Sequence, residues 1–525
     1  MKKCVNKNNF SDNTMKVIIV LISTMFFIGY MIPMLYAYFT SDLFIYVNAW
    51  DEESYMTYQS ALGDLKRPGY YFAALITLLF QLIGISGSIQ NVLFDMILIT
   101  AITFFIYKTL THYKIESFYA FVFAIIILFS SVLFNYANPL LRDFFPVRHI
   151  HTLMFGYESY ATILRTPNPQ ISYFLVIFAI YYFQMKSNRL ILLLPLPFLY
   201  FYVAIPYFYF LIIFFYLATF TQTVNFKNIL ISSLFAYILI AVGIILMDKL
   251  FLQNTHIVLY TKEYYFRTHE VFVPLVSVVS LFFFSIQYKA YSIDNKKNSL
   301  TLLHLQTFIL LGTFLLGNIQ IISGYFLSYK NYYDYSFSIL AGISISIFLY
   351  SMVNIFKNNF VKYIAMLAFL FPMLYIHLTS QGFQFSKMQF KIYMGEGTLP
   401  KNSIEKIIKD PTHALITSLD LRSKVAYALP HITIPPLSYQ YRFPFIERQC
   451  THNQHLFNNA MYYLKNNHPE SLKYFTDEYK EYNKLKTLYK DKKQNTSSSC
   501  NKSLYSNTDF FLIPVDNQHI WHYFP

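Results

Sequence analysis

The stretch VIIVLISTMFFIGYMIPMLYAYF, residues 17–39, contains no charged side chain and decides the fold class. It is longer than the roughly 20 apolar residues that a helix needs to cross a bilayer. Comparable apolar stretches recur as far as residue 379, and only 13% of the 525 residues are charged. A soluble domain carries about 25%. The sequence therefore predicts a multi-pass α-helical membrane protein.

The same composition excludes several other classes. Long uncharged stretches are incompatible with a soluble enzyme, a secreted disulfide scaffold or a disordered regulator. They do not alternate between apolar and polar residues as the strands of an outer-membrane barrel would. The net charge of +14 lies mainly in short loops between apolar stretches, which is typical of cytoplasmic loops and not of a nucleic-acid surface. An enzyme, a transporter, a channel and an assembly factor remain.

Lysine and arginine in the short loops set the predicted orientation. The basic tail 1–16 precedes a first span without a cleavage site, so we expect the N-terminus in the cytoplasm. Placing the later basic loops on the same side predicts about eleven spans between residues 17 and 379, with the C-terminus outside. The predicted external loops are 40–87, 135–170, 248–270 and 323–335.

Two stretches are harder to assign. Residues 70–82 are hydrophobic but short, and with the residues up to Tyr107 they form either two short spans or one membrane-surface segment and one span. If the basic residues after Tyr107 are cytoplasmic, only one crossing fits between the first external loop and them. A segment in the outer leaflet, followed by a crossing at 88–107, is therefore favoured. Residues 190–221 contain prolines, and for them we expect two short crossings with a turn near Ala204.

Residues 380–525 have the composition of a soluble domain. Residues 414–421, 432–435 and 509–514 resemble short strands, and residues 456–465 and 470–486 have helical periodicity. We expect a small external α/β domain. Cys450 and Cys500 could form a disulfide in it, which the sequence leaves open.

The densest external acidic cluster is Asp51-Glu52-Glu53 in the first loop. A helix that begins at Asp51 would place Tyr55 on an apolar stripe against the bilayer surface, and its dipole would keep the carboxylates ionised. Such a carboxylate can accept a proton from a hydroxyl or bind a divalent cation, and helix capping is the simpler alternative. Neighbouring helical residues point in different directions, so Asp51 and Glu52 would have different roles.

A first span from the cytoplasm, Asp51-Glu52 followed by Tyr55, and Lys66-Arg67-Pro-Gly-Tyr before a hydrophobic stretch together resemble the GT-C superfamily of membrane glycosyltransferases. Protein O-mannosyltransferases and lipid A aminoarabinose transferases belong to it. The resemblance is close over roughly the first hundred residues and architectural beyond them. It implies a sugar donor on polyprenyl phosphate, with Asp51 as the leading candidate base and Glu52 second. Tyr55, Lys66 and Arg67 become candidate donor contacts, although relatives often carry Lys-Pro-Pro where this chain has Arg-Pro-Gly.

The second external loop supplies cations for the phosphate that would depart from such a donor. It contains Arg142-Asp143 and ends in Arg165-Thr-Pro-Asn-Pro-Gln at the mouth of the next span. Negative charge that develops on a leaving phosphate is stabilised by guanidinium groups. Arg165 could instead snorkel to anchor a helix end, and Asp143 could be a second active-site carboxylate or a local partner of Arg142. Lys330, in the fourth loop, is another candidate phosphate contact.

Three further signals are weaker. His149 and His151 have no third ligand at a fixed spacing, so a polar loop is favoured over a metal site. Asp95 lies inside a predicted span near its outer end, where it would either line the external cavity or pair with a polar neighbour, and pairing is favoured. No glycine-rich turn for a nucleotide pyrophosphate is present, which agrees with a lipid-linked donor.

The leading hypothesis is an inverting glycosyltransferase at the outer face of a bacterial cytoplasmic membrane. It would move a sugar from a polyprenyl-phosphate donor to a glycan, lipid or protein acceptor. No cofactor is certain, a divalent cation remains an option, and no nucleic-acid partner is expected. The alternatives are a polysaccharide flippase or other transporter, and a lipid-linked glycan polymerase. A transporter should carry its functional charges inside the spans and repeat its architecture.

Overall fold

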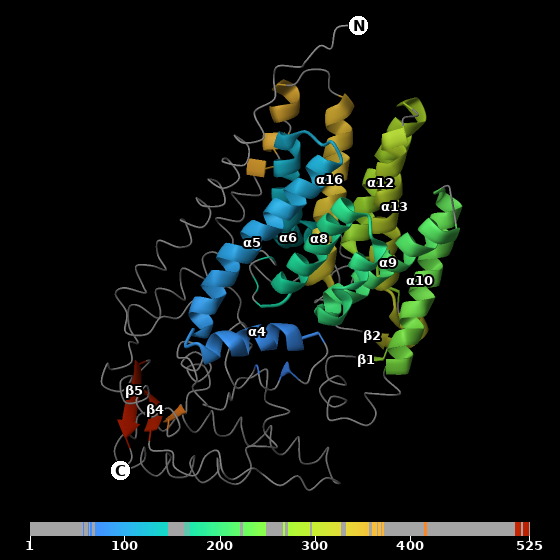
Figure 1. The fold of residues 1–525 in the computed structure, drawn as a ribbon. Coiled ribbons are helices and arrows are strands. Elements are labelled where there is room, and N and C mark those ends of the chain that lie inside the picture. Colours follow the sequence, from blue (N-terminus) through green and yellow to red (C-terminus); the bar gives the residue numbers. More distant parts are fainter. Residues whose placement is uncertain are drawn as a thin grey trace. The chain divides into compact units, whose positions relative to one another are not determined.

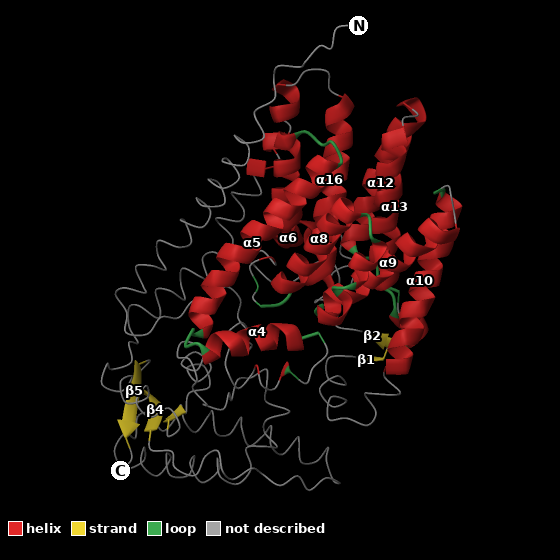
Figure 2. Cartoon of the chain, in the orientation of Figure 1, coloured by secondary structure: helices red, strands yellow, loops and turns green. Residues whose placement is uncertain are grey.

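The computed structural model describes residues 69–144, 167–220, 224–247, 271–294, 297–326 and 332–355, with the short stretches 56, 61, 64–65, 163, 165, 266–267, 360–364, 366–368, 370–371, 414–416, 510–515 and 518–523. Helices dominate these residues (Figure 2). The chain divides into two compact units. One comprises Met1–Phe27 and Asp95–Gln384, and the other comprises Ile28–Phe94 and Phe385–Pro525.

The first unit is built from helices that follow one another along the chain (Figure 1). Helix α5 begins in the second unit and continues into the first. The bounds are α5 Gly87–His112, α6 Ser117–Phe144, α8 Gln170–Lys186, α9 Phe201–Phe220, α10 Phe226–Met247, α12 Leu275–Asp294, α13 Lys297–Leu316, α14 Gln320–Ser323 and α16 Ser338–Ile355. Short 3₁₀ turns, η2 Arg189–Leu193 and η3 Leu196–Phe198, precede α9, and a π-helical turn, η5 Tyr333–Phe337, leads into α16.

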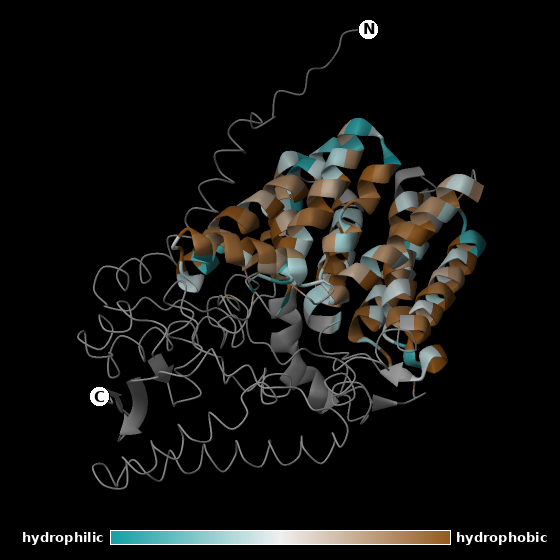
Figure 3. Cartoon of the chain, turned by 60° about the horizontal axis from the view of Figure 1, so that its bottom comes forward, coloured by the Kyte–Doolittle hydropathy of each residue, from teal (hydrophilic) through white to brown (hydrophobic). Residues whose placement is uncertain are grey.

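Five helices among the described residues are long and apolar enough to cross a membrane. They are Gly87–His112, Phe201–Phe220, Phe226–Leu246, Leu300–Ser323 and Tyr335–Val353. Brown, apolar residues cover much of the helices coloured in Figure 3. Most lie where the sequence predicts spans, so the multi-pass helical character is supported. The first predicted span, 17–39, lies outside the described residues, and the count of eleven stays a prediction.

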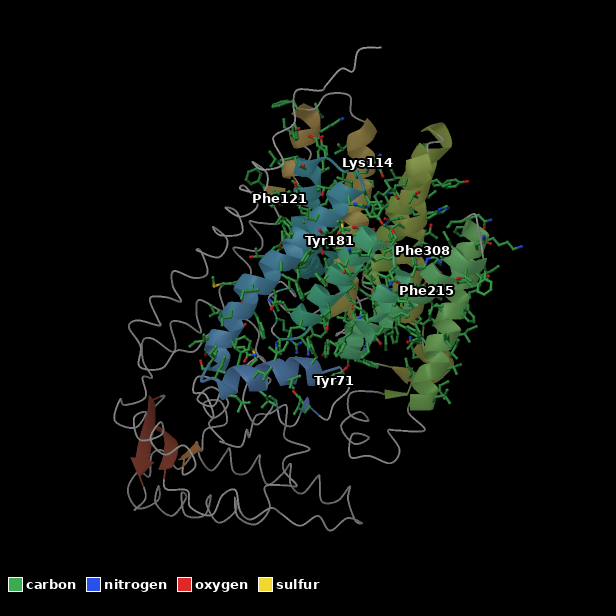
Figure 4. The ribbon with its side chains drawn as sticks, in the orientation of Figure 1. Tyr71, Lys114, Phe121, Tyr181, Phe215 and Phe308 are labelled. Atoms are coloured by element: carbon green, nitrogen blue, oxygen red, sulfur yellow. The ribbon has the colours of Figure 1, made fainter. Side chains whose placement is uncertain are left out.

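Close packing of α16 against α6 depends on a glycine. A Cβ added at Gly342 of α16 would lie 2.6 Å from the Ser130 hydroxyl and 2.7 Å from the Ile127 Cα of α6. The Ser130 hydroxyl also donates to the Ser338 carbonyl at 2.6 Å. Small residues that let two backbones approach, joined by a hydroxyl hydrogen bond, are typical of helix pairs in membranes. Helix α16 also packs against α12 and α13, and aromatic side chains such as Phe121, Tyr181, Phe215 and Phe308 are spread through the unit (Figure 4).

The predicted turn near Ala204 is wrong, because α9 continues through Ala204 and Pro206. Pro206 has no N–H to donate to the carbonyl of Tyr202, four residues earlier. That carbonyl instead accepts a hydrogen bond from the Ser336 hydroxyl at 2.5 Å. A side chain from η5 therefore replaces the missing helical donor, and the proline does not break the helix.

The second predicted external loop, 135–170, begins with residues that are helical in the structure, and its place outside the membrane stays a prediction. Helix α6 continues to Phe144, so Arg142 and Asp143 lie in its last turn instead of in a loop. In the sequence, Asn138 and Pro139 suggest that the helix is interrupted. The apolar residues Leu140, Leu141 and Phe144 nevertheless continue a helical spacing. Proline also keeps φ close to the helical value, so tertiary packing can hold the helix through it.

The third and fourth predicted external loops meet in the structure. Strand β1, Phe266–Arg267, pairs antiparallel with strand β2, Tyr325–Phe326. Phe266 lies opposite Phe326, and Arg267 lies opposite Tyr325. The two loops therefore lie at the same end of the helices they connect.

In the second unit, helix α4 spans Tyr71–Leu82 and is only 12 residues long. One face buries Ala74, Leu78 and Gln81, whereas Leu75, Leu79 and Leu82 are exposed. Gly84, with φ of +84°, follows it. The prediction of a separate short segment at 70–82 is confirmed, and its place in the outer leaflet stays a prediction.

The second unit also contains three described strands, β3 Ala414–Ile416, β4 Phe510–Val515 and β5 Gln518–Tyr523. Strand β4 pairs parallel with β3 and antiparallel with β5. Two of these strands coincide with predicted ones, at 414–421 and 509–514. The predicted strand 432–435 and both predicted helices lie outside the described residues, so the α/β domain stays a prediction.

Candidate functional site

A buried arginine precedes helix α8. Residues 163–170 lead into the helix, and in this segment Ile163, Arg165, Asn168 and Gln170 are each at most 5% exposed. The first helical turn forms when the N–H of Ile171 donates to the Pro167 carbonyl at 3.0 Å. Prolines at positions 167 and 169 restrict the backbone here, so the polar side chains of the segment are held close to the start of the helix.

Two contacts with described residues orient the Arg165 guanidinium. Its Nη1 donates to the Asn168 carbonyl at 2.5 Å. Its Cζ lies 4.7 Å from the ring centroid of Tyr335, a cation–π distance. The guanidinium is therefore fixed in orientation by the loop on one side and by η5 on the other. A snorkelling arginine would have its head group in water, whereas Arg165 is only 3% exposed.

Gln170 joins this loop to α5. Its Nε2 donates to Asp95 Oδ1 at 2.9 Å and to the Ile163 carbonyl at 3.0 Å. Asp95 is 5% exposed. The expectation that Asp95 pairs with a polar neighbour is confirmed, and the neighbour belongs to the loop that carries Arg165. Asp95 and Arg165 are therefore parts of one buried polar cluster.

Tyr335 is held by helices α8 and α9. Its carbonyl accepts a hydrogen bond from the Tyr173 hydroxyl of α8, and its ring packs 5.5 Å from the ring of Tyr200 and 6.3 Å from that of Tyr202. The Tyr200 N–H in turn donates to the Ser172 hydroxyl of α8 at 2.8 Å. The starts of α8, α9 and α16 thus converge around the arginine. We name Asp95, Arg165, Asn168, Gln170 and Tyr335 the Arg165 cluster.

Electrostatically, the start of α8 favours an anion. The helix has 17 residues, no acidic residue in its first turn and no side-chain hydrogen bond at its N-cap, Pro169. Its dipole therefore leaves partial positive charge beside the guanidinium of Arg165. Burial raises the pKa of the nearby Tyr332 phenol well above its usual value, with a smaller contribution from Tyr202, so Tyr332 stays neutral. The guanidinium and the helix N-terminus both attract an oxyanion such as phosphate, whereas Asp95 adds a negative charge on the other side of Gln170.

Among the predicted site residues, the structure places Arg165 in this cluster. Arg142 and Asp143 lie at the end of α6, where only the backbone is described. Six others lie outside the described residues: Asp51, Glu52, Tyr55, Lys66, Arg67 and Lys330. His149 and His151 do as well, and the described residues contain no group of three or more side chains that could hold a metal ion.

Sequence reasoning missed Gln170 and Tyr335 as members of the cluster. Gln170 follows Arg165 in the proline-rich segment, which is a usable signal. Tyr335 is one of 48 tyrosines, and nothing local distinguishes it. Its role depends on a contact across 170 positions of sequence, from residue 165 to residue 335.

Comparison with known proteins identifies no relative. No family model and no curated protein matches the chain. The evidence for a function therefore comes from the chain itself.

Proposed function

We propose that this protein is a membrane glycosyltransferase of the GT-C type. It moves a sugar from a polyprenyl-phosphate donor to a glycan, lipid or protein acceptor at the outer face of a cytoplasmic membrane. One observation carries the proposal: Arg165 is buried beside the start of α8 and is held by the Asn168 carbonyl and the Tyr335 ring.

Burial of a permanently charged group favours an anionic ligand. Removing a guanidinium from water is costly, and ionisable groups that are buried among apolar membrane helices usually have a function. A lipid phosphate carries the required negative charge and reaches the protein from the bilayer. Its charge also increases when the sugar leaves, so an arginine held in advance would stabilise the transition state more than the ground state.

The proposed reaction is a direct displacement at the anomeric carbon. The acceptor oxygen forms a bond to that carbon as the bond to the phosphate oxygen breaks, and the configuration inverts. Asp51 takes the acceptor's proton, and the lipid phosphate leaves with the bonding electron pair. Arg165 stabilises the departing phosphate. Arg142 and Lys330 are further candidates for that role, and Glu52 and Asp143 are candidates for orienting the acceptor or binding a divalent cation.

The test uses the full chain in membrane vesicles with radiolabelled polyprenyl-phosphate-sugar. Transfer of label to an endogenous acceptor should fall at least about 100-fold in Asp51→Asn and in Arg165→Gln. Arg165→Lys should retain part of the activity, because it keeps the charge and loses the planar fork. Arg189→Gln is the matched control, since Arg189 is exposed at the start of η2. Equal transfer by wild type, Asp51→Asn and Arg165→Gln would disprove the mechanism.

A lipid-linked glycan flippase is the second candidate function. It is favoured by buried uncharged polar side chains that line the contacts of α12, α13 and α16, including Ser280, Gln306 and Ser344. Such residues could line a path through the helices. Movement of a fluorescent lipid-linked glycan from one leaflet of a proteoliposome membrane to the other, without transfer of its sugar, would favour this function over the transferase.

A further inference from the structure

Two buried amide atoms of the Arg165 cluster have no hydrogen-bond partner among the residues that the structure describes. They are Nδ2 of Asn168, a donor, and Oε1 of Gln170, an acceptor. The two residues are 5% and 0% exposed, respectively. Both atoms are closed to solvent, so bulk water does not satisfy them in the structure described here. Each buried polar atom without a partner costs about 1–3 kcal/mol, so a ligand that supplies the partner recovers this energy on binding.

The orientation of the Gln170 amide is well determined. Its Nε2 faces two acceptors, Asp95 Oδ1 and the Ile163 carbonyl, at 2.9 and 3.0 Å. The reverse orientation would place the amide oxygen against both acceptors, which is repulsive. Gln170 therefore offers an acceptor and no second donor to anything that enters the cluster.

One donor and one acceptor beside a cation match a particular chemistry. A hydroxyl group both donates and accepts, whereas an ionised phosphate oxygen only accepts. We infer that Asn168 and Gln170 recognise a hydroxyl of the group attached to the anion that Arg165 binds. The ligand of the cluster is thus a hydroxyl-bearing phosphate ester, such as a sugar phosphate on a lipid. This inference rests on the proposed function and adds the residues that select the sugar-bearing donor.

Selection by buried amides is expected to be strong. A site that hydrogen-bonds a hydroxyl discriminates against an analogue without it, because the polar groups of the site are then left unpaired. After sugar transfer the product is the bare lipid phosphate, which lacks the hydroxyl and would leave the two amides unpaired again. The cluster should therefore bind the donor more tightly than the product. Because both atoms are buried, binding includes a local opening of the loop.

The experiment measures dissociation constants of the purified full chain in nanodiscs for undecaprenyl phosphate and undecaprenyl phosphate glucose. Wild type should prefer the glucose-bearing lipid by about tenfold or more. Asn168→Leu, which keeps the side-chain size, should reduce this preference by about tenfold and change the affinity for the bare phosphate by less than about threefold. Gln170→Met should reduce the preference as well, and it also removes the hydrogen bonds to Asp95 and to the Ile163 carbonyl. Gln184→Met is the control, because Gln184 lies on the same helix and its amide also lacks partners among the described residues.

Deoxyglucose-bearing lipids provide a second measurement that needs no variant. Wild type should bind at least one monodeoxy lipid as weakly as the bare phosphate. Equal binding of all deoxy lipids would overturn the inference, as would an unchanged preference in both variants. Either result would mean that the two amides bind only water, and it would leave the proposed transferase activity untouched. Failure of wild type to bind either lipid and to transfer sugar would overturn the proposed function itself.

Discussion

Two buried polar regions of the first unit differ in charge and in what they contact. Between α12, α13 and α16, the polar side chains are neutral: Ser277 meets Thr313 at 2.9 Å, and Ser280 meets Ser344 at 3.2 Å. The Arg165 cluster instead contains an arginine and an aspartate. Neutral hydroxyls are inexpensive to bury and join helices, whereas charges are expensive to bury. Under the proposed function, the first region therefore serves mainly stability and the second mainly ligand binding.

Unpaired amide atoms alone do not separate the two regions. Oε1 of Gln306, in the neutral region, also lacks a partner among the described residues, as Oε1 of Gln170 does. What distinguishes the Arg165 cluster is that a free donor, a free acceptor and a cation occur within six residues of one loop, beside a helix N-terminus. The comparison therefore predicts that substitutions in the two regions have opposite effects on activity and stability.

The largest expected effect is on sugar transfer in Arg165→Gln. Loss of the charge should reduce transfer at least about 100-fold, because one removed charge-stabilising donor costs about 2.7–4 kcal/mol in a transition state. The thermal midpoint of the protein in detergent should change by only a few degrees, since the variant loses the guanidinium's contacts but also loses the cost of burying its charge. Scanning fluorimetry and the vesicle assay measure both. A large loss of stability with normal specific activity would mean that Arg165 has a structural role, like the neutral side chains between α12, α13 and α16.

The opposite pattern is expected for Gly342→Val in α16. Its Cβ would meet the Ser130 hydroxyl and the Ile127 Cα at 2.6 and 2.7 Å, so α6 and α16 must separate. Overpacking of this kind costs about 1–3 kcal/mol. The variant should unfold at a lower temperature, and the fraction that remains folded should keep its transfer rate. Val353→Ile, a one-carbon enlargement at another buried position of the same helix, is the control and should have a smaller effect.

How far the sequence predicts the structure depends on the range of the interactions. The apolar stretches at 88–107, 229–247 and 337–353 predict helices, because hydrophobicity and length are local properties. Continuity of α9 through Pro206 was not predictable, since the carbonyl of Tyr202 is satisfied by Ser336, more than a hundred residues away. Arg165 was predictable from its place beside prolines. Its association with Asp95 through Gln170 was not, because it depends on the tertiary contact of α5 with the loop before α8.

A double-mutant cycle tests the contact between Ser336 and α9, which connects the cluster to helix packing. Ser336→Ala should cost about 1 kcal/mol, because it removes the hydroxyl that donates to the Tyr202 carbonyl. In a Pro206→Ala background the restored N–H can donate to that carbonyl, so the cost of Ser336→Ala should fall to a few tenths of a kcal/mol. Urea unfolding in detergent measures all four proteins. Equal costs in both backgrounds would show that Ser336 does not compensate for the proline.

The smallest effect is expected for Gln306→Leu in the neutral region. Its Nε2 donates to the Ser280 carbonyl at 3.3 Å and to the Ser344 hydroxyl, so the substitution removes contacts between α13 and both α12 and α16. Hydrogen bonds between membrane helices contribute about 0.6 kcal/mol on average, and the unpaired Oε1 offsets part of that gain. Stability should therefore fall slightly while sugar transfer is unchanged. Loss of transfer, or gain of lipid-linked glycan leakage across proteoliposomes, would move the functional path into this region and favour the flippase.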